Sequence, residues 1–155
     1  MKLGIGICAR NEESSIIPML DSVRDSAQNT STLSEWHLFV CANGCTDNTL
    51  PLLKIWIQAN PQVKTMLIEF EKANLVEGQR EIVKYAKREG ITSIIFFDAD
   101  VIVEKECVSE LLLAARSDSA KAVYAVSVPI QREKQTLLES ALNQYDLTPT
   151  IFSPR

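Results

Sequence analysis

Glycine is scarce in this chain, with only 5 glycines among 155 residues. The phosphate-binding loops of dinucleotide-binding enzymes and P-loop nucleotidases need closely spaced glycines, in the patterns GxGxxG and GxxxxGK[ST]. Neither pattern occurs anywhere in the sequence. Protein kinases, P-loop ATPases and typical NAD-dependent enzymes are therefore disfavoured.

Histidine and cysteine are also few, with 1 and 4 residues. No motif surrounds His37, so little supports a Ser-His-Asp or Cys-His catalytic system. Cys41 and Cys45 lie four residues apart, but no second Cys/His pair accompanies them, which disfavours a structural zinc site. Cys8 and Cys41 lie in apolar segments and are interpreted as small buried hydrophobic residues.

The chain has neither an excess of basic residues nor a long apolar run. Its net charge is -4, whereas a nucleic-acid-binding surface needs a basic face. No segment reaches the roughly 18–20 apolar residues of a membrane-spanning helix, and the short apolar run at residues 3–9 is expected to be a strand rather than a signal peptide. We therefore expect no nucleic-acid partner, no transmembrane segment and a cytoplasmic location, which includes the cytosolic face of a membrane.

Short apolar segments alternate with segments of helical periodicity along the chain. Hydrophobic residues make up 46% of the sequence, enough for the core of one ordinary domain spanning residues 1–155. Strands are expected at residues 3–8, 36–41, 63–70, 92–98 and 120–130. Helices are expected at residues 12–26, 46–58, 76–89, 104–115 and 135–145. This alternation predicts a three-layer α/β/α fold around a mostly parallel sheet.

Three short polar segments follow expected strands: Ala9-Arg10-Asn11, Ala42-Asn43-Gly44 and Asp98-Ala99-Asp100. In parallel α/β sheets, ligands bind outside the carboxyl ends of the strands. The three segments are therefore expected to meet at one edge of the sheet. This convergence points to a ligand site more strongly than any one of the segments does.

Asp98 and Asp100 follow the most hydrophobic of the expected strands. Strand side chains alternate between faces, so residues two apart point the same way while the strand geometry continues. Both carboxylates could then approach one divalent cation, and Mg²⁺ is often held by one or two carboxylates together with substrate phosphates. The pair predicts metal-assisted binding of a diphosphate. The alternative is that two acidic residues simply solubilise the end of a strand.

The other two segments have a structural and a functional reading. Glu12 and Glu13 could complement the dipole of the following helix, whereas Arg10 could pair with a phosphate or a neighbouring carboxylate. Thr46 or Asp47 is expected to cap the next helix. A well-made connection between strand and helix would explain residues 42–49 without any ligand.

In this order, the segments resemble the motifs of the inverting family 2 glycosyltransferases, which have the Rossmann-like GT-A fold of nucleotide-diphospho-sugar transferases. The family pattern Tyr/Arg-Asn-Glu after the first strand is similar to residues 10–12. The pattern Asp-Asp/Asn-Gly-Ser-Thr-Asp-x-Thr is similar to residues 42–49, and the Asp-x-Asp (DxD) motif to residues 98–100. The resemblance covers about residues 3–130.

The resemblance implies that a sugar is transferred with inversion from a nucleoside diphosphate sugar, UDP- or GDP-linked, to an unknown acceptor. It implies Mg²⁺ or Mn²⁺ held by Asp98 and Asp100. The implied donor site consists of Cys8, Ala9, Arg10, Asn11, Glu12, Ala42, Asn43, Gly44, Arg80, Asp98, Ala99 and Asp100. Arg80, like Lys72, is either a phosphate contact or an ordinary surface charge.

Two departures from the family pattern leave alternatives open. Ala42 stands where the family commonly has an aspartate that touches the base, so the nucleotide is not defined. The family's catalytic base lies in a later acceptor-side segment, and Glu133 and Glu139 are interpreted as solvated helix residues. We therefore expect a donor-binding part that lacks the C-terminal acceptor-side segment and forms a homo-oligomer through an open apolar face. The alternative is a non-catalytic nucleotide-binding or oligomerisation module, whereas a nucleotidyltransferase, which needs a glycine-rich first loop, is disfavoured.

Overall fold

The computed structural model describes residues 2–116 of the chain. The expected strand at 120–130 and the expected helix at 135–145 lie outside the described residues. All of the strands below belong to one compact unit, Met1–Leu113. The expectation of a single domain over residues 1–155 stays a prediction.

Strands and helices alternate along the described part of the chain, as the sequence pattern predicts. In chain order they are β1 (Lys2–Ala9), α1 (Ile16–Asn29), β2 (Glu35–Asn43), α2 (Thr49–Ala59), β3 (Lys64–Phe70), α3 (Leu75–Arg88), β4 (Ser93–Asp98) and α4 (Cys107–Ala114). The first two helices begin three or four residues later than expected, because the residues ahead of them form loops with their own hydrogen bonds. None of these helices, all within residues 2–116, is long and apolar enough to cross a bilayer.

The described strands form one parallel sheet in the order β3-β2-β1-β4. Each pair of consecutive parallel strands is joined through a helix, as crossover connections require. The carboxyl ends of β1, β2 and β4 therefore lie next to one another at one edge of the sheet. This edge is called the rim below.

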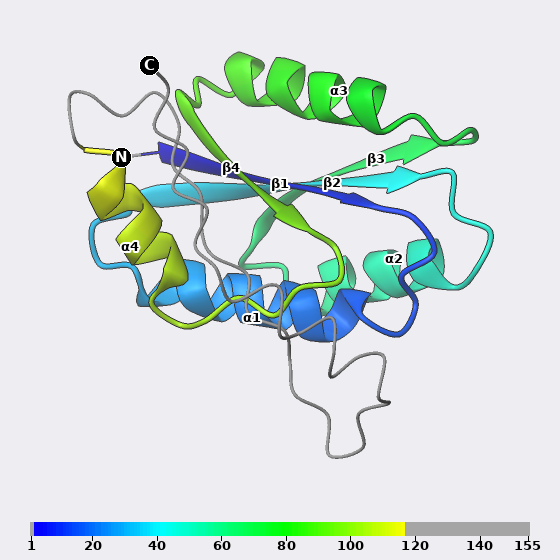
Figure 1. Cartoon of the computed structure of the whole chain (residues 1–155), viewed down its shortest axis with the longest axis horizontal. Coiled ribbons are helices and arrows are strands. Elements are labelled where there is room, and N and C mark those ends of the chain that lie inside the picture. Colours follow the sequence, from blue (N-terminus) through cyan, green and yellow to red (C-terminus); the bar gives the residue numbers. More distant parts are fainter. Residues whose placement is uncertain (1, 117–155) are drawn as a thin grey trace, which may run out of the picture. The chain divides into compact units, whose positions relative to one another are not determined.

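Helices cover both faces of the sheet, which confirms the three-layer α/β/α architecture (Figure 1). Because strand side chains alternate, Leu3, Ile5 and Ile7 of β1 pack on one face, in the core that also includes buried residues of α1, α2 and α4. On the other face, Phe39 and Cys41 of β2 pack with the buried side of α3. The two cores hold the sheet rigidly enough to fix the positions of the strand ends.

Helix α3 follows from a simple sequence pattern. Gly78, Ile82 and Ala86 recur at intervals of four residues and are the buried positions of the helix. Gly78 permits a close approach, because a Cβ added there would lie only 3.0 Å from the sulfur of Cys41 and 3.3 Å from that of Cys8. The start of α3 therefore rests directly on the ends of β1 and β2.

A charged cluster ties the strands together at the end of the sheet opposite the rim. The carboxylate of Glu35 accepts hydrogen bonds from Nε2 of His37 (2.9 Å) and Nζ of Lys64 (2.9 Å), and pairs with Lys2 at 3.1 Å. The bond from His37, followed by those from the two lysines, lowers the pKa of Glu35 to about 2. His37 is buried and stacks on Phe39. Its place in the fold is thus structural and remote from the rim.

Candidate functional site

The rim brings together the three polar segments that the sequence singles out. In the strand register, Cys8 of β1 lies between Cys41 of β2 and Asp98 of β4. Ala9 pairs with Ala42 one residue further on, and both are buried. Residues 33 apart (Cys8 and Cys41) and 90 apart (Cys8 and Asp98) in the sequence thus become direct neighbours at one edge of the sheet.

Asn11 joins the loop after β1 to the loop after β2. Its φ of 57° is left-handed, a conformation that asparagine tolerates better than most residues. In this conformation its Oδ1 accepts hydrogen bonds from the backbone N–H of Thr46 (2.8 Å) and from the Thr46 hydroxyl (3.3 Å). The side-chain oxygen of Asn11 is therefore engaged in holding the two loops together.

The acidic residues of the first loop strengthen the same connection. Asn48 donates to Oε2 of Glu13 from its backbone N–H (3.0 Å) and its side-chain amide (2.9 Å). In return, the N–H of Glu13 donates to Asp47 (3.1 Å), and the N–H of Glu12 donates to the hydroxyl of Thr49 (2.7 Å). We call these contacts, together with those of Asn11, the loop clamp. These contacts give Glu13 a structural role between the loops, beyond any interaction with the helix dipole.

Asp47 supports the start of α2 as well as the clamp. Its Oδ1 accepts the N–H of Thr49 at 3.0 Å, although the N-cap position itself is Asn48, one residue later than expected. Desolvation acts to raise the pKa of Asp47, but the hydrogen bonds from Thr49 and from the Glu13 N–H outweigh it and lower the pKa. An ionised Asp47 is thus a structural part of the clamp.

A third loop, between β3 and α3, is held against the end of β2. Oδ1 of the buried Asn43 accepts the N–H of Asn74 at 2.7 Å, and Oδ1 of Asn74 accepts the N–H of Glu77 at 3.1 Å. The N–H of Gly44 donates to the carbonyl of Phe70 at 3.0 Å. Asn43 therefore sets the position of the N-terminus of α3 at the rim.

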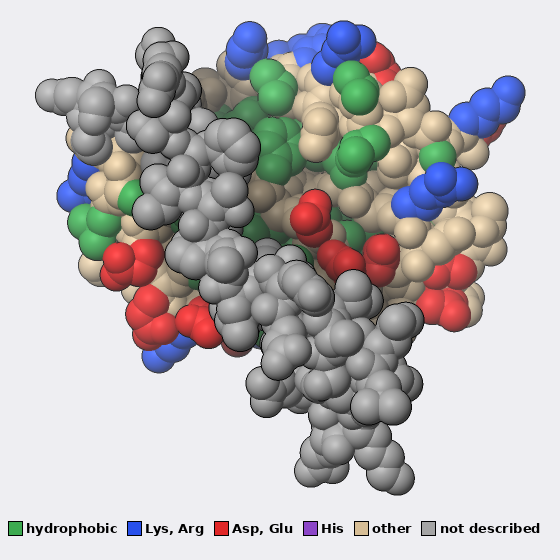
Figure 2. Space-filling model, viewed as in Figure 1, with side chains coloured by type: hydrophobic (Ala, Val, Ile, Leu, Met, Phe, Trp, Pro, Cys, Tyr) green, Lys and Arg blue, Asp and Glu red, His purple; other side chains and the backbone are tan. Residues whose placement is uncertain are grey.

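Asp98 and Asp100 stand at the remaining corner of the rim. Asp98 is the last residue of β4, while Ala99 and Asp100 form a turn, so the strand geometry does not continue to Asp100 as the shared-face argument required. Both carboxylates are exposed, and neither makes a hydrogen bond or ion pair among residues 2–116. Figure 2 shows acidic side chains grouped where β4 ends.

The carboxylates of Asp98 and Asp100 are ligands of the type that a hard divalent cation takes. Carboxylate oxygens are the ligands that Mg²⁺ and Mn²⁺ prefer, and no protein cation neutralises this pair in the described part of the chain. Residues 2–116 contain no group of three or more His, Cys, Asp or Glu side chains that could hold a metal ion alone. A cation at this corner would therefore take its other ligands from a bound phosphate group or from water.

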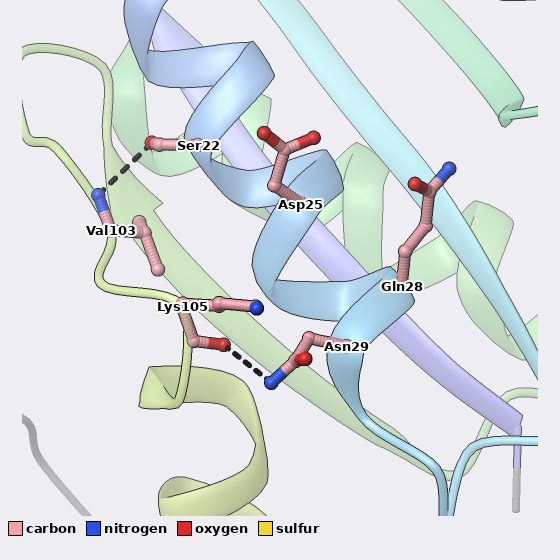
Figure 3. Close-up of a pocket in the computed structure, with 6 residues that line it drawn as sticks. All are labelled: Ser22, Asp25, Gln28, Asn29, Val103 and Lys105. Atoms are coloured by element: carbon pink, nitrogen blue, oxygen red, sulfur yellow. Dashed lines mark hydrogen bonds between the residues drawn. The ribbon is translucent and has the colours of Figure 1, made fainter.

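Helix α1 fixes the chain that leads away from this corner. The hydroxyl of Ser22 accepts the N–H of Val103 at 3.0 Å, and the buried hydroxyl of Ser26 accepts the N–H of Val108 at 3.2 Å and donates to the carbonyl of Lys105 at 3.1 Å. A cavity of about 650 Å³ lies beside these contacts (Figure 3). It is lined by Ser22, Asp25, Gln28, Asn29, Val103 and Lys105 and by none of the predicted site residues. The contacts of α1 thus fix the chain at residues 103–108, after the Asp98–Asp100 turn.

Comparison with known proteins assigns the chain to a family. The sequence profile described as Glycosyl transferase family 2 matches residues 5–150, nearly the whole chain. The chain belongs to glycosyl transferase family 2. The resemblance noted from the three motifs is therefore confirmed, although none of the curated proteins compared with the chain matches it.

Solved structures show the same fold. The chain is similar to S. aureus TarS 1-349, with a TM-score of 0.57 at 17% identity, over 90% of this chain and 43% of that one. For TarS 1-349 in complex with UDP, the TM-score is 0.60 at 17% identity, over 83% and 39%. For the longer TarS chain it is 0.58 at 16% identity, over 83% and 24%. The fold of this family 2 chain is thus GT-A, and the chain spans less than half the length of each of these structures.

One predicted site residue of the family 2 chain lies away from the others. Arg80 lies in α3 two residues after Gly78, so it projects from the side of the helix opposite the sheet. Its side chain is 73% exposed and pairs with Glu77 at 3.4 Å. No contact joins it to the rim among residues 2–116, and its assignment to the donor site stays a prediction.

One neighbouring position, Asn74, was missed by sequence reasoning, whereas Lys72 was weighed as either a phosphate contact or a surface charge. Asn74 precedes Glu77 by three residues at the start of a helix, a capping pattern that could have identified it. Lys72 lies directly beside the turn at Gly44, where a Cβ would come 3.0 Å from the Lys72 carbonyl carbon. Lys72 and Arg10 are exposed, and neither is hydrogen-bonded or ion-paired in the described part of the chain. They are two uncommitted cations on loops of the rim.

Proposed function

We propose that the chain is the donor-binding part of an inverting glycosyltransferase that takes a nucleoside diphosphate sugar. The observation that carries this proposal is the pair of carboxylates of Asp98 and Asp100, which have no partner among residues 2–116, at the rim of a family 2 chain. They stand beside the end of β1, where Arg10 supplies a positive charge that no described residue pairs with. Opposite charges at one edge suit a diphosphate, because some of its oxygens would bind the metal at the carboxylates and others would pair with a positive charge.

The residues of the rim divide into two groups in this proposal. The base and ribose would lie along residues 8–12 and the turn at Ala42 and Asn43, on loops that the clamp makes rigid. Asp98 would lie near the ribose and Asp100 at the diphosphate, where both could hold Mg²⁺ or Mn²⁺. When bound, the cation would neutralise the charge that develops on the diphosphate leaving group. Preformed loops reduce the entropy that donor binding must overcome.

UDP is the first nucleotide to test. One of the similar structures is described as a complex with UDP, which supports a uridine donor for this chain by analogy of fold. Ala42 is buried and has no polar side-chain atom, so the base would have to be recognised by backbone groups or by the neighbouring loop. GDP is the alternative that the same rim would accommodate.

A second candidate function is a nucleotide-binding or oligomerisation module without transfer activity. The apolar Ala42, at a position where the family commonly has an aspartate, favours it. Exposed apolar side chains on the described surface, among them Leu75, Val76 and Phe96, are compatible with self-association. The two functions differ in one measurable respect, because only a transferase turns over its donor.

Titration calorimetry with UDP, GDP, CDP and ADP, each with and without Mn²⁺, tests the donor site. We expect one nucleoside diphosphate to bind only with Mn²⁺, and Asp100→Asn to weaken that binding at least tenfold, since one charged ligand is worth about 1.4 kcal/mol or more. Glu89→Gln is the matched control, an exposed carboxylate just after the C-terminal end of α3 and remote from the rim. Binding that ignores both Mn²⁺ and Asp100→Asn would refute the metal–diphosphate site.

Release of UDP from a UDP-sugar panel then separates the two candidate functions. Slow donor hydrolysis, lost in Asp100→Asn and retained in Glu89→Gln, supports a transferase. Tight, metal-dependent binding of nucleotide without any release from any donor supports the non-catalytic module.

Association with the cytosolic face of a membrane stays a prediction.

A further inference from the structure

Cys8, at the edge of the proposed donor site, and Cys41 form a pair whose thiols the donor chemistry does not use. They are register partners on the neighbouring parallel strands β1 and β2. Neighbouring strands lie about 4.8 Å apart. This spacing falls within the range of roughly 4.4–6.8 Å found between the Cα atoms of disulfide-linked cysteines.

The two side chains also point to the same face of the sheet. A single point, the Cβ position of an alanine at Gly78, lies 3.0 Å from the sulfur of Cys41 and 3.3 Å from the sulfur of Cys8. The Cys41 thiol lies close enough to lower the pKa of the Cys8 thiol. They therefore already meet in the reduced protein, under the first turns of α3.

The two cysteines differ in access to solvent. Cys8 is half-buried, whereas Cys41 is fully buried. Cys45 packs in the core on the other face of the sheet and donates to the carbonyl of Ala9 at 3.4 Å. Cys107 lies at the start of α4. Among residues 2–116, Cys41 is thus the thiol placed to react with Cys8.

We propose that Cys8 and Cys41 are a reversible oxidation site that closes to a disulfide between β1 and β2. The sulfur of Cys8 attacks a hydroperoxide, the O–O bond breaks, and Cys8 becomes a sulfenic acid while the leaving oxygen departs as water or an alcohol. The sulfur of Cys41 then displaces the hydroxyl group of the sulfenic acid, which leaves as a second water as the S–S bond forms. Two thiols are oxidised and one peroxide is reduced.

The bond is expected to be readily opened by thiols. Cβ atoms of relaxed disulfides lie about 3.8 Å apart, roughly 1 Å closer than the strand spacing that separates these side chains. Closure must therefore pull β1 and β2 together where the loops of the rim begin. This site is independent of the proposed donor chemistry, since it needs only the two thiols and an oxidant.

Peroxide treatment of the reduced full-length chain, followed by alkylation, thiol titration and peptide mass spectrometry, tests the proposal. We expect the chain to lose two of its 4 thiols and to recover both with dithiothreitol. Trypsin should release residues 3–10 joined to residues 25–54. Because the second peptide also contains Cys45, the experiment is repeated with Cys45→Ser, in which the joined peptides should persist. Cys107→Ser is the matched control and should also retain them.

Three results would overturn the proposal. The first is folded protein that keeps all of its thiols in excess peroxide. The second is Cys8 that proceeds to sulfinic acid without any joined peptide, which would show that Cys41 does not resolve it. The third is a joined peptide that disappears in Cys45→Ser and survives in Cys41→Ser. The wild-type thiol count decides the first result even if one of the variants folds poorly.

Discussion

Gly44 and Gly90 provide a matched test of how the rim is built. Their φ angles are 69° and 70°, so alanine would be equally strained by the left-handed backbone at either position. Their surroundings differ, because a Cβ at Gly44 would lie 2.5 Å from the backbone nitrogen of Ala73, whereas nothing lies within 4 Å at Gly90. The difference between Gly44→Ala and Gly90→Ala therefore isolates the contact between the loops after β2 and β3.

The expected magnitudes follow from these two environments. A left-handed alanine costs about 1–2 kcal/mol, and the stiffer unfolded chain returns about 0.4–1, so Gly90→Ala should lower the free energy of unfolding by about 1 kcal/mol. In Gly44→Ala the turn must also move away from Ala73. This movement breaks the hydrogen bond from Gly44 to Phe70 and disturbs the buried one between Asn43 and Asn74, together worth about 2–3 kcal/mol. The total for Gly44→Ala is about 3–4 kcal/mol.

Urea and thermal denaturation, followed by tryptophan fluorescence, measure both changes. The chain has 2 tryptophans, Trp36 in β2 and Trp56 in α2, so the signal reports the unit that contains both glycines. One kcal/mol shifts Tm by roughly 2–4 °C in a domain of this size. We expect a decrease in Tm of that order for Gly90→Ala and about three times as much for Gly44→Ala.

The clash at Gly44 is with backbone rather than with a side chain, which makes the reasoning easy to refute. A flexible side chain could move aside, but the nitrogen of Ala73 cannot move without displacing the loop that starts α3. Equal losses of stability in the two variants would show that this loop yields at little cost. The rim would then be a set of independent loops rather than one connected structure.

Two further predictions concern the clamp and the cluster at Glu35. Asn11→Gly keeps the left-handed backbone but loses the bonds to Thr46, so it should lower the free energy of unfolding by about 1 kcal/mol. Asn11→Ala also strains the left-handed backbone and should lower it by about 2 kcal/mol. Denaturation midpoints that rank the two variants the other way would contradict the clamp. The pKa of Glu35 is about 2 in the folded chain against an ordinary 4.5, so its stabilisation is complete above about pH 4.5 and is lost as the pH falls toward 2. Tm measured across this range should fall less steeply in Glu35→Gln than in the wild type, and parallel curves would exclude the cluster as a cause of acid sensitivity.

The order of elements and the position of the rim could be predicted because both follow from local patterns. Apolar segments such as residues 94–97 identify strands, and the polar residues at their ends identify the edge where parallel strands finish. Asp98 needed no further information to be placed at this edge. The strand ends at Asp98, as the expected range 92–98 has it. Only the shared-face argument for Asp100 fails, because it needed the strand geometry to continue into the turn.

The contacts that make the rim rigid could not be predicted in the same way. Asn43 and Asn74 are 31 residues apart, and Asn11 and Thr46 are 35 apart. Each residue taken alone looks like an ordinary turn or cap, because asparagine suits both uses. Only the parallel register of β1, β2 and β3 brings the loops close enough to bond. Sequence reasoning therefore predicted which segments meet at the rim, but not that the side chains of Asn11 and Asn43 hold its loops together.

The use of motif side chains to hold the loops together changes what the motifs mean for function. The side-chain oxygens of Asn11, Glu13 and Asp47 are engaged within the protein, so these residues can recognise a donor only through rigid backbone or their remaining atoms. Charge that has no partner within residues 2–116 is carried instead by residues such as Arg10 and Asp100. A substitution in the clamp should therefore alter stability and donor binding together, whereas a substitution of an uncommitted charge should alter binding alone. Measuring both quantities for Asn11→Gly and Asp100→Asn separates the scaffold of the site from its chemistry.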